Sequence, residues 1–145
     1  MKPMNLLVVP GITITGGSMK IAATTQNGGL HDVILPQFGR APSFTIIELD
    51  KDIKSVEVIQ NPACMQPSGA GIMASQILVD RGVKVLLTGN VGPKAMSVLK
   101  SAGIKIYRAD GLTVEEAVRR FMNGQLEEIT SPVGGMGRGR GGRWI

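Results

Sequence analysis

Residues 83–99 read VKVLLTGNVGPKAMSVL, and this stretch decides the class of fold. The near-continuous apolar run at 83–87 is typical of a strand that is covered on both faces of a sheet. A glycine turn at 89–92 follows, and Pro93 suits the first position of a helix because the N–H that proline lacks has no partner there. The residues after it form one apolar stripe at helical spacing: Ala95, Met96, Val98 and Leu99. A buried strand that runs directly into an amphipathic helix predicts an α/β protein.

Strand patterns lie on both sides of this unit. Upstream, residues 20–24 form a short strand, and a turn at 50–52 joins strands 43–49 and 54–60 into an antiparallel hairpin. Downstream, residues 104–107 form another strand. Because strands that are connected through helices must run parallel, the hairpin and the helical crossovers together predict a five-stranded mixed sheet.

Three helices are predicted, each with a recognisable start and end. The start signals are an N-cap serine, a first-turn proline, and an N-cap threonine followed by a capping-box glutamate: Ser68, Pro93, Thr113 and Glu116. The end signals are glycines just beyond the last turn: Gly82, Gly103 and Gly124. The helices alternate with the last strands, as layers on the faces of a sheet require.

The chain divides into three parts. Residues 19–129 form a single domain, because the strand and helix patterns fill that range. Residues 1–18 are predicted to be an upstream extension that is disordered, with an extra edge strand as the alternative. Residues 130–145 are rich in glycine and arginine and are predicted to be a disordered tail.

The composition excludes several classes of protein. Cys64 and His31 are the only residues of their kinds in 145, which rules out paired-cysteine zinc sites and two-histidine metal sites. No apolar run approaches the roughly 20 residues of a membrane helix, and no secretory signal is recognisable. We therefore expect a cytoplasmic protein with no membrane partner. Carboxylate pairs and nucleophile–base pairs are not placed together, so we expect no enzymatic activity.

Sulfur side chains precede the first helix. Cys64 and Met65 are soft ligands of the kind that suit copper(I) or metal–sulfur clusters, and they lie in a loop just before a helix N-terminus. The unpaired N–H groups and partial positive charge of that terminus would stabilise a thiolate or an anionic cluster. The alternative, that Cys64 is a small buried hydrophobic residue, stays open.

Further candidate binding residues come from three loops. Arg40 can offer a bidentate fork to an anion, although the residues alone favour a surface ion-pair partner. His31 is a candidate metal ligand, although a single loop histidine is usually only solvated. The remaining candidates lie in glycine-rich turns that open helices: Gly69, Ala70, Gly71, Gly89 and Asn90.

The ordered set of segments resembles the dinitrogenase iron–molybdenum cofactor biosynthesis family, including its small archaeal and bacterial members. The resemblance spans about residues 19–128 and is carried by Met19-Lys20-Ile21-Ala22, Phe38-Gly39-Arg40-Ala41-Pro42, Asn61-Pro62, Gly69-Ala70-Gly71, Gly82-Val83, Gly89, Gly92-Pro93, Gly103-Ile104 and Val114-Glu115-Glu116.

This resemblance implies a ribonuclease-H-like sheet without nuclease activity. It also implies a carrier of an iron–molybdenum or molybdenum–copper sulfur cluster, with a cluster donor or acceptor protein as partner. Family members often have histidine directly before Phe-Gly-Arg, where this chain has Gln37. If that histidine ligates or orients the cluster in other members, this chain must use Cys64, Met65 or His31 instead, or bind no cluster.

Two other functions remain open. The tail carries Arg138, Arg140 and Arg143 without any acidic residue, which would permit weak, nonspecific and salt-dependent binding of RNA. The glycine turns that open the helices could instead bind a small anion of another kind.

Overall fold

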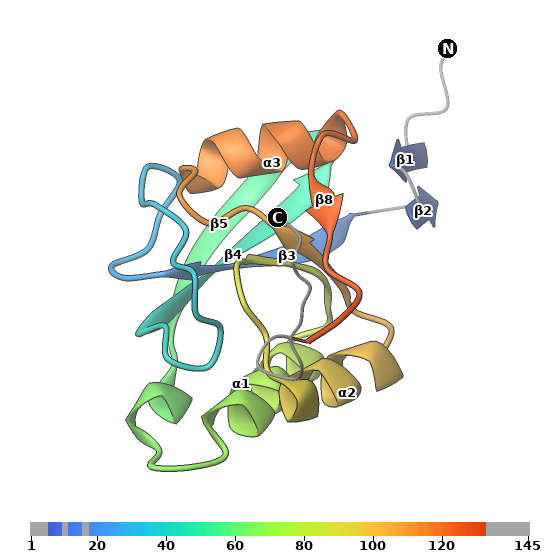
Figure 1. The fold of residues 1–145 in the computed structure, drawn as a ribbon. Helices are drawn as coiled ribbons and strands as arrows, with labels where there is room; N and C mark the ends of the chain where they lie inside the picture. The colour runs from blue at the N-terminus through green and yellow to red at the C-terminus, as the bar shows by residue number, and fades with distance from the viewer. Residues whose placement is uncertain (1–5, 10–11, 16–17, 133–145) are drawn as a thin grey trace, which may run out of the picture.

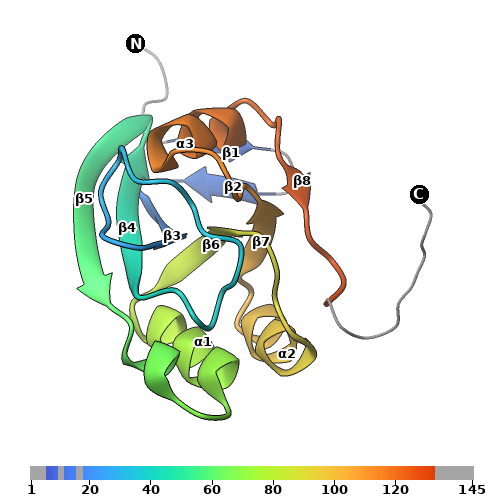
Figure 2. The same ribbon diagram turned by 60° about the vertical axis from the view of Figure 1, so that its left-hand side comes forward.

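The computed structural model describes residues 6–9, 12–15 and 18–132. Its centre is a six-stranded sheet in the order β5-β4-β3-β6-β7-β8 (Figure 2). The strands are β3 (Met19–Thr25), β4 (Ser43–Asp50), β5 (Asp52–Gln60), β6 (Val83–Thr88), β7 (Lys105–Arg108) and β8 (Glu127–Glu128). Strands β5, β4 and β3 pair antiparallel, whereas β3, β6 and β7 run parallel. The prediction of a mixed sheet is therefore confirmed.

The number of strands in this sheet corrects the prediction of five. The sixth strand, β8, pairs antiparallel with β7 through two residues, Glu127 and Glu128. Both side chains are exposed, and their carboxylates lie 3.8 Å and 3.7 Å from the cationic groups of Arg108 and Lys105. Two adjacent glutamates carry no strand periodicity, so this strand exists through its pairing with β7 rather than through a local pattern.

Helices cover both faces of the sheet. Helices α1 (Ala70–Asp80) and α2 (Pro93–Ser101) lie on one face, and α3 (Val114–Met122) lies on the other (Figure 1). A short 3-10 helix, η1 (Pro62–Met65), precedes α1. Each face has its own core: Phe44, Ile46, Leu78, Leu86 and Leu99 on the α1–α2 side, and Ile21, Ile47, Leu87, Val118 and Phe121 on the α3 side. Within the described ranges, no helix has the length and apolar character to cross a membrane.

The helix starts agree with the sequence at two of three positions. Pro93 opens α2, and the hydroxyl of Thr113 accepts a hydrogen bond from the Glu116 N–H at 3.2 Å. The Glu116 carboxylate, however, pairs with Arg120 at 2.8 Å instead of completing a capping box. Ser68 is not the N-cap of α1, because Gly69 holds that position with a φ of 77°.

The N-terminal segment contains two short strands. β1 (Leu6–Val9) and β2 (Ile12–Thr15) pair antiparallel with each other in a sheet separate from the main one. The strands of the alternative prediction thus exist, but they do not extend the edge of the six-stranded sheet. The predicted tail lies largely outside the described residues, which end at 132.

Candidate functional site

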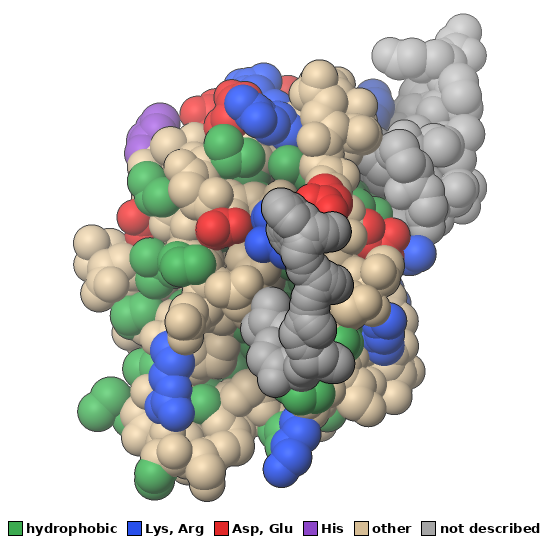
Figure 3. Space-filling view, in the orientation of Figure 1, with side chains coloured by type: hydrophobic (Ala, Val, Ile, Leu, Met, Phe, Trp, Pro, Cys, Tyr) green, Lys and Arg blue, Asp and Glu red, His purple; other side chains and the backbone are tan. Residues whose placement is uncertain are grey.

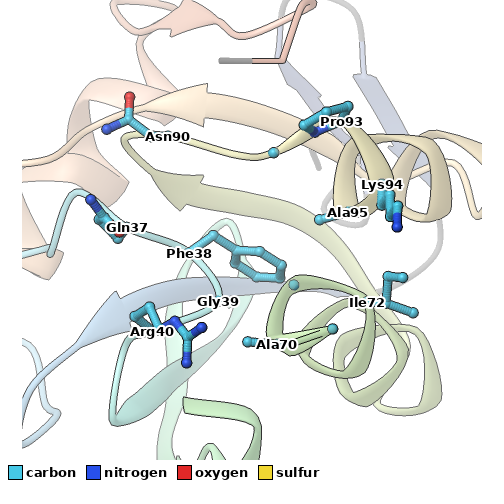
Figure 4. A pocket seen from close by; sticks show the side chains of 13 residues that line it. Gln37, Phe38, Gly39, Arg40, Ala70, Ile72, Asn90, Pro93, Lys94 and Ala95 are labelled. Atoms are coloured by element: carbon cyan, nitrogen blue, oxygen red, sulfur yellow. The ribbon is translucent and has the colours of Figure 1, made fainter. Parts of the chain in front are cut away.

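A pocket of about 480 Å³ opens where β3 and β6 end at their carboxyl termini (Figure 4). Its walls come from residues 37–40, from the start of α1 at 69–72, and from the start of α2 between Asn90 and Ala95. The carboxyl end of parallel strands is the place where open α/β sheets bind ligands. The volume lies in the range of roughly 300–1,000 Å³ that is usual for ligand pockets.

Backbone hydrogen bonds hold the first wall against the third. The Phe38 N–H donates to the carbonyl oxygen of Asn90 at 3.2 Å, and the Asn90 N–H donates to the carbonyl oxygen of Pro36. The Phe38 side chain is buried and packs against Phe44, with ring centroids 5.7 Å apart. Phe38 is therefore a core residue, and its packing fixes the loop that carries Arg40.

Two glycines allow the walls to approach one another. A Cβ atom on Gly39 would lie 2.9 Å from the Gly71 backbone nitrogen, and a Cβ atom on Gly71 would lie 3.0 Å from the Ala95 Cβ. The loop therefore meets the first turn of α1 backbone to backbone, and the backbone of α1 at Gly71 packs against the Ala95 side chain of α2. This brings the N-termini of both helices to the same pocket.

The pocket is electropositive. Gly69 and Gly92 are the N-caps of α1 and α2, and neither helix has a side-chain cap or an acidic residue in its first turn. The backbone N–H groups of these turns and the positive ends of the helix dipoles favour an anion. Arg40 and Lys94 line the pocket, and no Asp or Glu is among its lining residues. Figure 3 shows Lys and Arg side chains, and no acidic side chain among the described residues, at the end of the visible face where α1 and α2 lie.

The Arg40 guanidinium is held by backbone carbonyls. Its Nη1 donates to the carbonyl oxygens of Cys64 at 3.2 Å and of Gln66 at 2.6 Å. Arg40 forms no ion pair with any described residue, so the surface ion-pair alternative is not what the structure shows.

The structure brings together most of the residues that were predicted to bind a cofactor. Arg40, Gly69, Ala70, Gly71 and Asn90 all line the pocket. Gly89 is not among the lining residues, and a Cβ atom there would be 2.7 Å from the carbonyl oxygen of Pro36. The tight packing at Gly89 explains the need for glycine there without direct contact to a ligand. That these residues bind a cofactor stays a prediction.

The three predicted metal ligands are not among the residues that line the pocket. Cys64 is half-buried in η1, and Met65 is 82% exposed. His31 is exposed in a loop whose Leu30 carbonyl accepts the Glu115 N–H at the start of α3, on the opposite face of the sheet. Across the described parts of the chain, no group of three His, Cys, Asp or Glu side chains could hold a metal ion.

Sequence reasoning missed Lys94 and Ile72, which line the pocket at the first turns of α2 and α1. Lys94 had a detectable signal. A cation in the first turn of a helix is electrostatically unfavourable, because it adds to the positive end of the dipole. A lysine directly after a helix-opening proline therefore indicates a site that needs positive charge. Ile72 had no such signal, since it continues the apolar pattern of its helix.

Comparisons with known proteins identify a family and one curated relative. The model of the family described as dinitrogenase iron-molybdenum cofactor matches residues 19–124. An uncharacterized protein of Methanocaldococcus jannaschii is 36% identical over 112 residues, covering 77% of this chain and 92% of that protein.

Solved structures are similar in fold as well as in sequence. The apo form of the orange protein from Desulfovibrio gigas superposes with a TM-score of 0.72 and 40% identity, covering 81% of this chain and 98% of that one. A Thermotoga protein provisionally assigned as NifB gives a TM-score of 0.68 and 35% identity, covering 86% of this chain and 99% of that one.

Proposed function

The chain belongs to the dinitrogenase iron-molybdenum cofactor family, and from that premise we propose that it binds and carries an anionic metal–sulfur cluster without catalysing a reaction. The observation that carries the proposal is the convergence of two helix N-termini without side-chain caps, Arg40 and Lys94 on one pocket whose lining contains no acidic residue. The cargo is an iron–molybdenum or a molybdenum–copper sulfur cluster.

The residues of the pocket fit a cargo that brings its own sulfur ligands. The lining contains no thiol, thioether, imidazole or carboxylate that could enter the coordination sphere of a metal. It offers instead the donors of Arg40 and Lys94 together with backbone N–H groups, which suit the sulfido and oxo surface of an anion. Charge and hydrogen bonds would therefore hold the cargo. Gln37, which stands where relatives often have histidine, can supply amide N–H donors at the same wall.

The proposed role implies a partner protein and a compartment. A carrier exchanges its cargo with a donor or acceptor protein, and we propose that it does so in the cytoplasm.

The strand order β5-β4-β3-β6-β7, with the antiparallel hairpin on one side and the parallel strands on the other, supports a ribonuclease-H-like classification of the domain.

Reconstitution tests the proposed cargo. Purified protein is incubated with tetrathiomolybdate and copper(I), or with iron, molybdate and sulfide, then desalted and examined by visible absorption and metal analysis. We expect a bound cluster in the unmodified chain and little in the double variant Arg40→Gln/Lys94→Gln, because two cations are lost from the pocket. Equal metal retention by both proteins would refute the proposal.

Two variants test whether the sulfur side chains of Cys64 and Met65 bind the cargo. If charge and hydrogen bonds hold the cargo, Cys64→Ala and Met65→Leu bind it as the unmodified chain does. Loss of binding in Cys64→Ala would instead assign the thiol as the anchor.

The smaller-anion alternative uses the same pocket, and it predicts that sulfate or phosphate at low millimolar concentration displaces tetrathiomolybdate. The RNA alternative depends on Arg138, Arg140 and Arg143, which lie outside the described residues, and it stays a prediction.

A further inference from the structure

Arg40 joins the pocket to the segment that carries the only thiol. Its Nη1 donates to the carbonyl oxygens of Cys64 and Gln66, at 3.2 Å and 2.6 Å, and the same side chain lines the pocket beside Ala70 (Figure 4). Among the described residues, no acceptor meets Nε or Nη2. A guanidinium has five N–H donors in a rigid plane, so these two nitrogens remain for a ligand.

A second set of hydrogen bonds ties the same two segments together. The Asn61 side chain is buried, and its Nδ2 donates to the carbonyl oxygen of Ala41 at 2.8 Å. Its Oδ1 accepts the Ala63 N–H at 3.1 Å. The turn at 39–41 and the segment at 61–66 therefore form one hydrogen-bonded unit. A shift of the second segment would move the acceptors that orient Arg40.

We propose that the carbonyl groups of Cys64 and Gln66 position the Arg40 guanidinium for the cargo, so that chemical modification of Cys64 weakens binding although its thiol does not line the pocket. The inference rests on the proposed function for the nature of the cargo. Two acceptors on one nitrogen fix the plane of the guanidinium before the anion arrives. Binding of the anion therefore does not carry the cost of ordering this side chain. Coupling is reciprocal, so an occupied pocket also steadies residues 64–66 and slows reaction of the thiol.

Alkylation of the single thiol tests the coupling. The full chain is treated with iodoacetamide, freed of reagent, and its affinity for tetrathiomolybdate is measured by equilibrium dialysis. We expect binding about tenfold weaker after alkylation, the loss of roughly one oriented charge-assisted contact. Cys64→Ala treated with the same reagent is the matched control and keeps the affinity of the untreated chain.

The outcomes separate positioning from coordination. Unchanged affinity after alkylation overturns the inference. Weak binding by Cys64→Ala also overturns it, because the thiol would then act as a direct ligand. In Arg40→Lys, which keeps the charge but loses the planar fork, alkylation should weaken binding no further. A full additional loss there would show that the adduct acts by a route that bypasses Arg40, and would contradict the inference.

A second measurement needs no anion. The rate at which iodoacetamide labels Cys64 is followed by mass spectrometry in proteins whose fold is checked by circular dichroism. Arg40→Ala and Arg40→Lys should label severalfold faster than the unmodified chain, because the 64–66 segment loses its tie. Lys94→Ala, which removes a pocket cation that does not contact this segment, should label at the original rate.

Equal rates in all four proteins overturn the coupling. If the unmodified chain does not bind tetrathiomolybdate, the proposed function fails, and the labelling rates still decide whether Arg40 holds the Cys64 segment. The two failures are thereby distinguished.

Discussion

At the scale of single residues, Gly39 sets the distance between the Arg40 loop and α1. A Cβ atom there would lie 2.9 Å from the Gly71 nitrogen and 3.1 Å from its Cα, and both are backbone atoms that cannot rotate away. We expect Gly39→Ala to lower the free energy of unfolding by about 1–3 kcal/mol, because the loop must move to relieve the overlap. Denaturant unfolding measures this.

Gly92→Ala is the matched control for Gly39→Ala. Gly92 also lines the pocket, but a Cβ atom there meets nothing within 4 Å, and its φ of −73° is accessible to alanine. Its cost should stay below about 1 kcal/mol, from the weaker N-cap preference of alanine. Equal destabilisation by the two substitutions would show that contact with α1 is not what requires glycine at 39.

Asp32 shows how one carboxylate can shape a loop. Burial raises the pKa of Asp32, but the hydrogen bonds from the backbone N–H groups of residues 26, 27, 28 and 33 together outweigh it and hold the pKa below the ordinary 3.8. A lowered pKa in the folded state gives stability that is present above the unfolded pKa and is lost as the pH falls through the folded value.

We therefore expect the unmodified chain to lose stability relative to Asp32→Asn as the pH falls below about 4. Near neutral pH, Asp32→Asn should be less stable by about 1 kcal/mol, a value reduced by solvent screening. Urea unfolding from pH 3 to 7 measures the difference. A gap between the two proteins that does not change with pH would contradict the assigned role of the carboxylate.

At the scale of elements, the three helices start in different ways, and the difference separates structure from function. α3 has a side-chain cap in Thr113 and two acidic residues, Glu115 and Glu116, in its first turn. α1 and α2 have glycine N-caps and neither feature. The capped N-terminus of α3 lies on the opposite face of the sheet, whereas the N-termini of α1 and α2, which have no side-chain cap, meet at the pocket. Uncapped N–H groups are thus concentrated where a ligand could accept their hydrogen bonds.

The α3 cap can be tested by substitution. Thr113→Ala should lower the free energy of unfolding by about 1 kcal/mol, because the Glu116 N–H loses its acceptor. Thr130→Ala is the control, since Thr130 is exposed and, among the residues that the structure describes, only its backbone oxygen accepts a hydrogen bond, from Lys100. Equal unfolding midpoints for the two variants would contradict the cap.

At the scale of the whole molecule, the pocket lies at the meeting of segments that are far apart in the chain. A cargo that contacts the 37–40 loop, α1 and α2 at once binds only the folded state, and it must therefore stabilise that state. At a free concentration one hundred times the dissociation constant, the gain is about 2.7 kcal/mol.

Thermal unfolding with increasing tetrathiomolybdate should show this gain as a rising midpoint. In Arg40→Gln/Lys94→Gln the midpoint should rise much less at the same concentrations, because the pocket has lost both of its cationic side chains. A shift of equal size in both proteins would mean that the anion binds elsewhere.

Local patterns were sufficient to predict three helices and five strands of the main sheet, because periodicity, caps and terminal glycines act within a few residues of one another. The run at 83–87, Pro93 and Thr113 each specify their own strand or helix boundary, and the structure confirms them. Strand β8 escaped prediction, since its two glutamates become a strand through pairing with β7.

The composition of the pocket, by contrast, depends on which loops the sheet brings to the same edge. Arg40, Gly71 and Asn90 meet because β3 and β6 lie side by side and parallel, a pairing that no local pattern encodes. The same packing leaves the Cys64 thiol outside the pocket while its carbonyl holds Arg40. The chemistry of the residues was therefore enough to identify candidates. Their roles follow from long-range strand pairing, because only that pairing determines which groups line the same pocket.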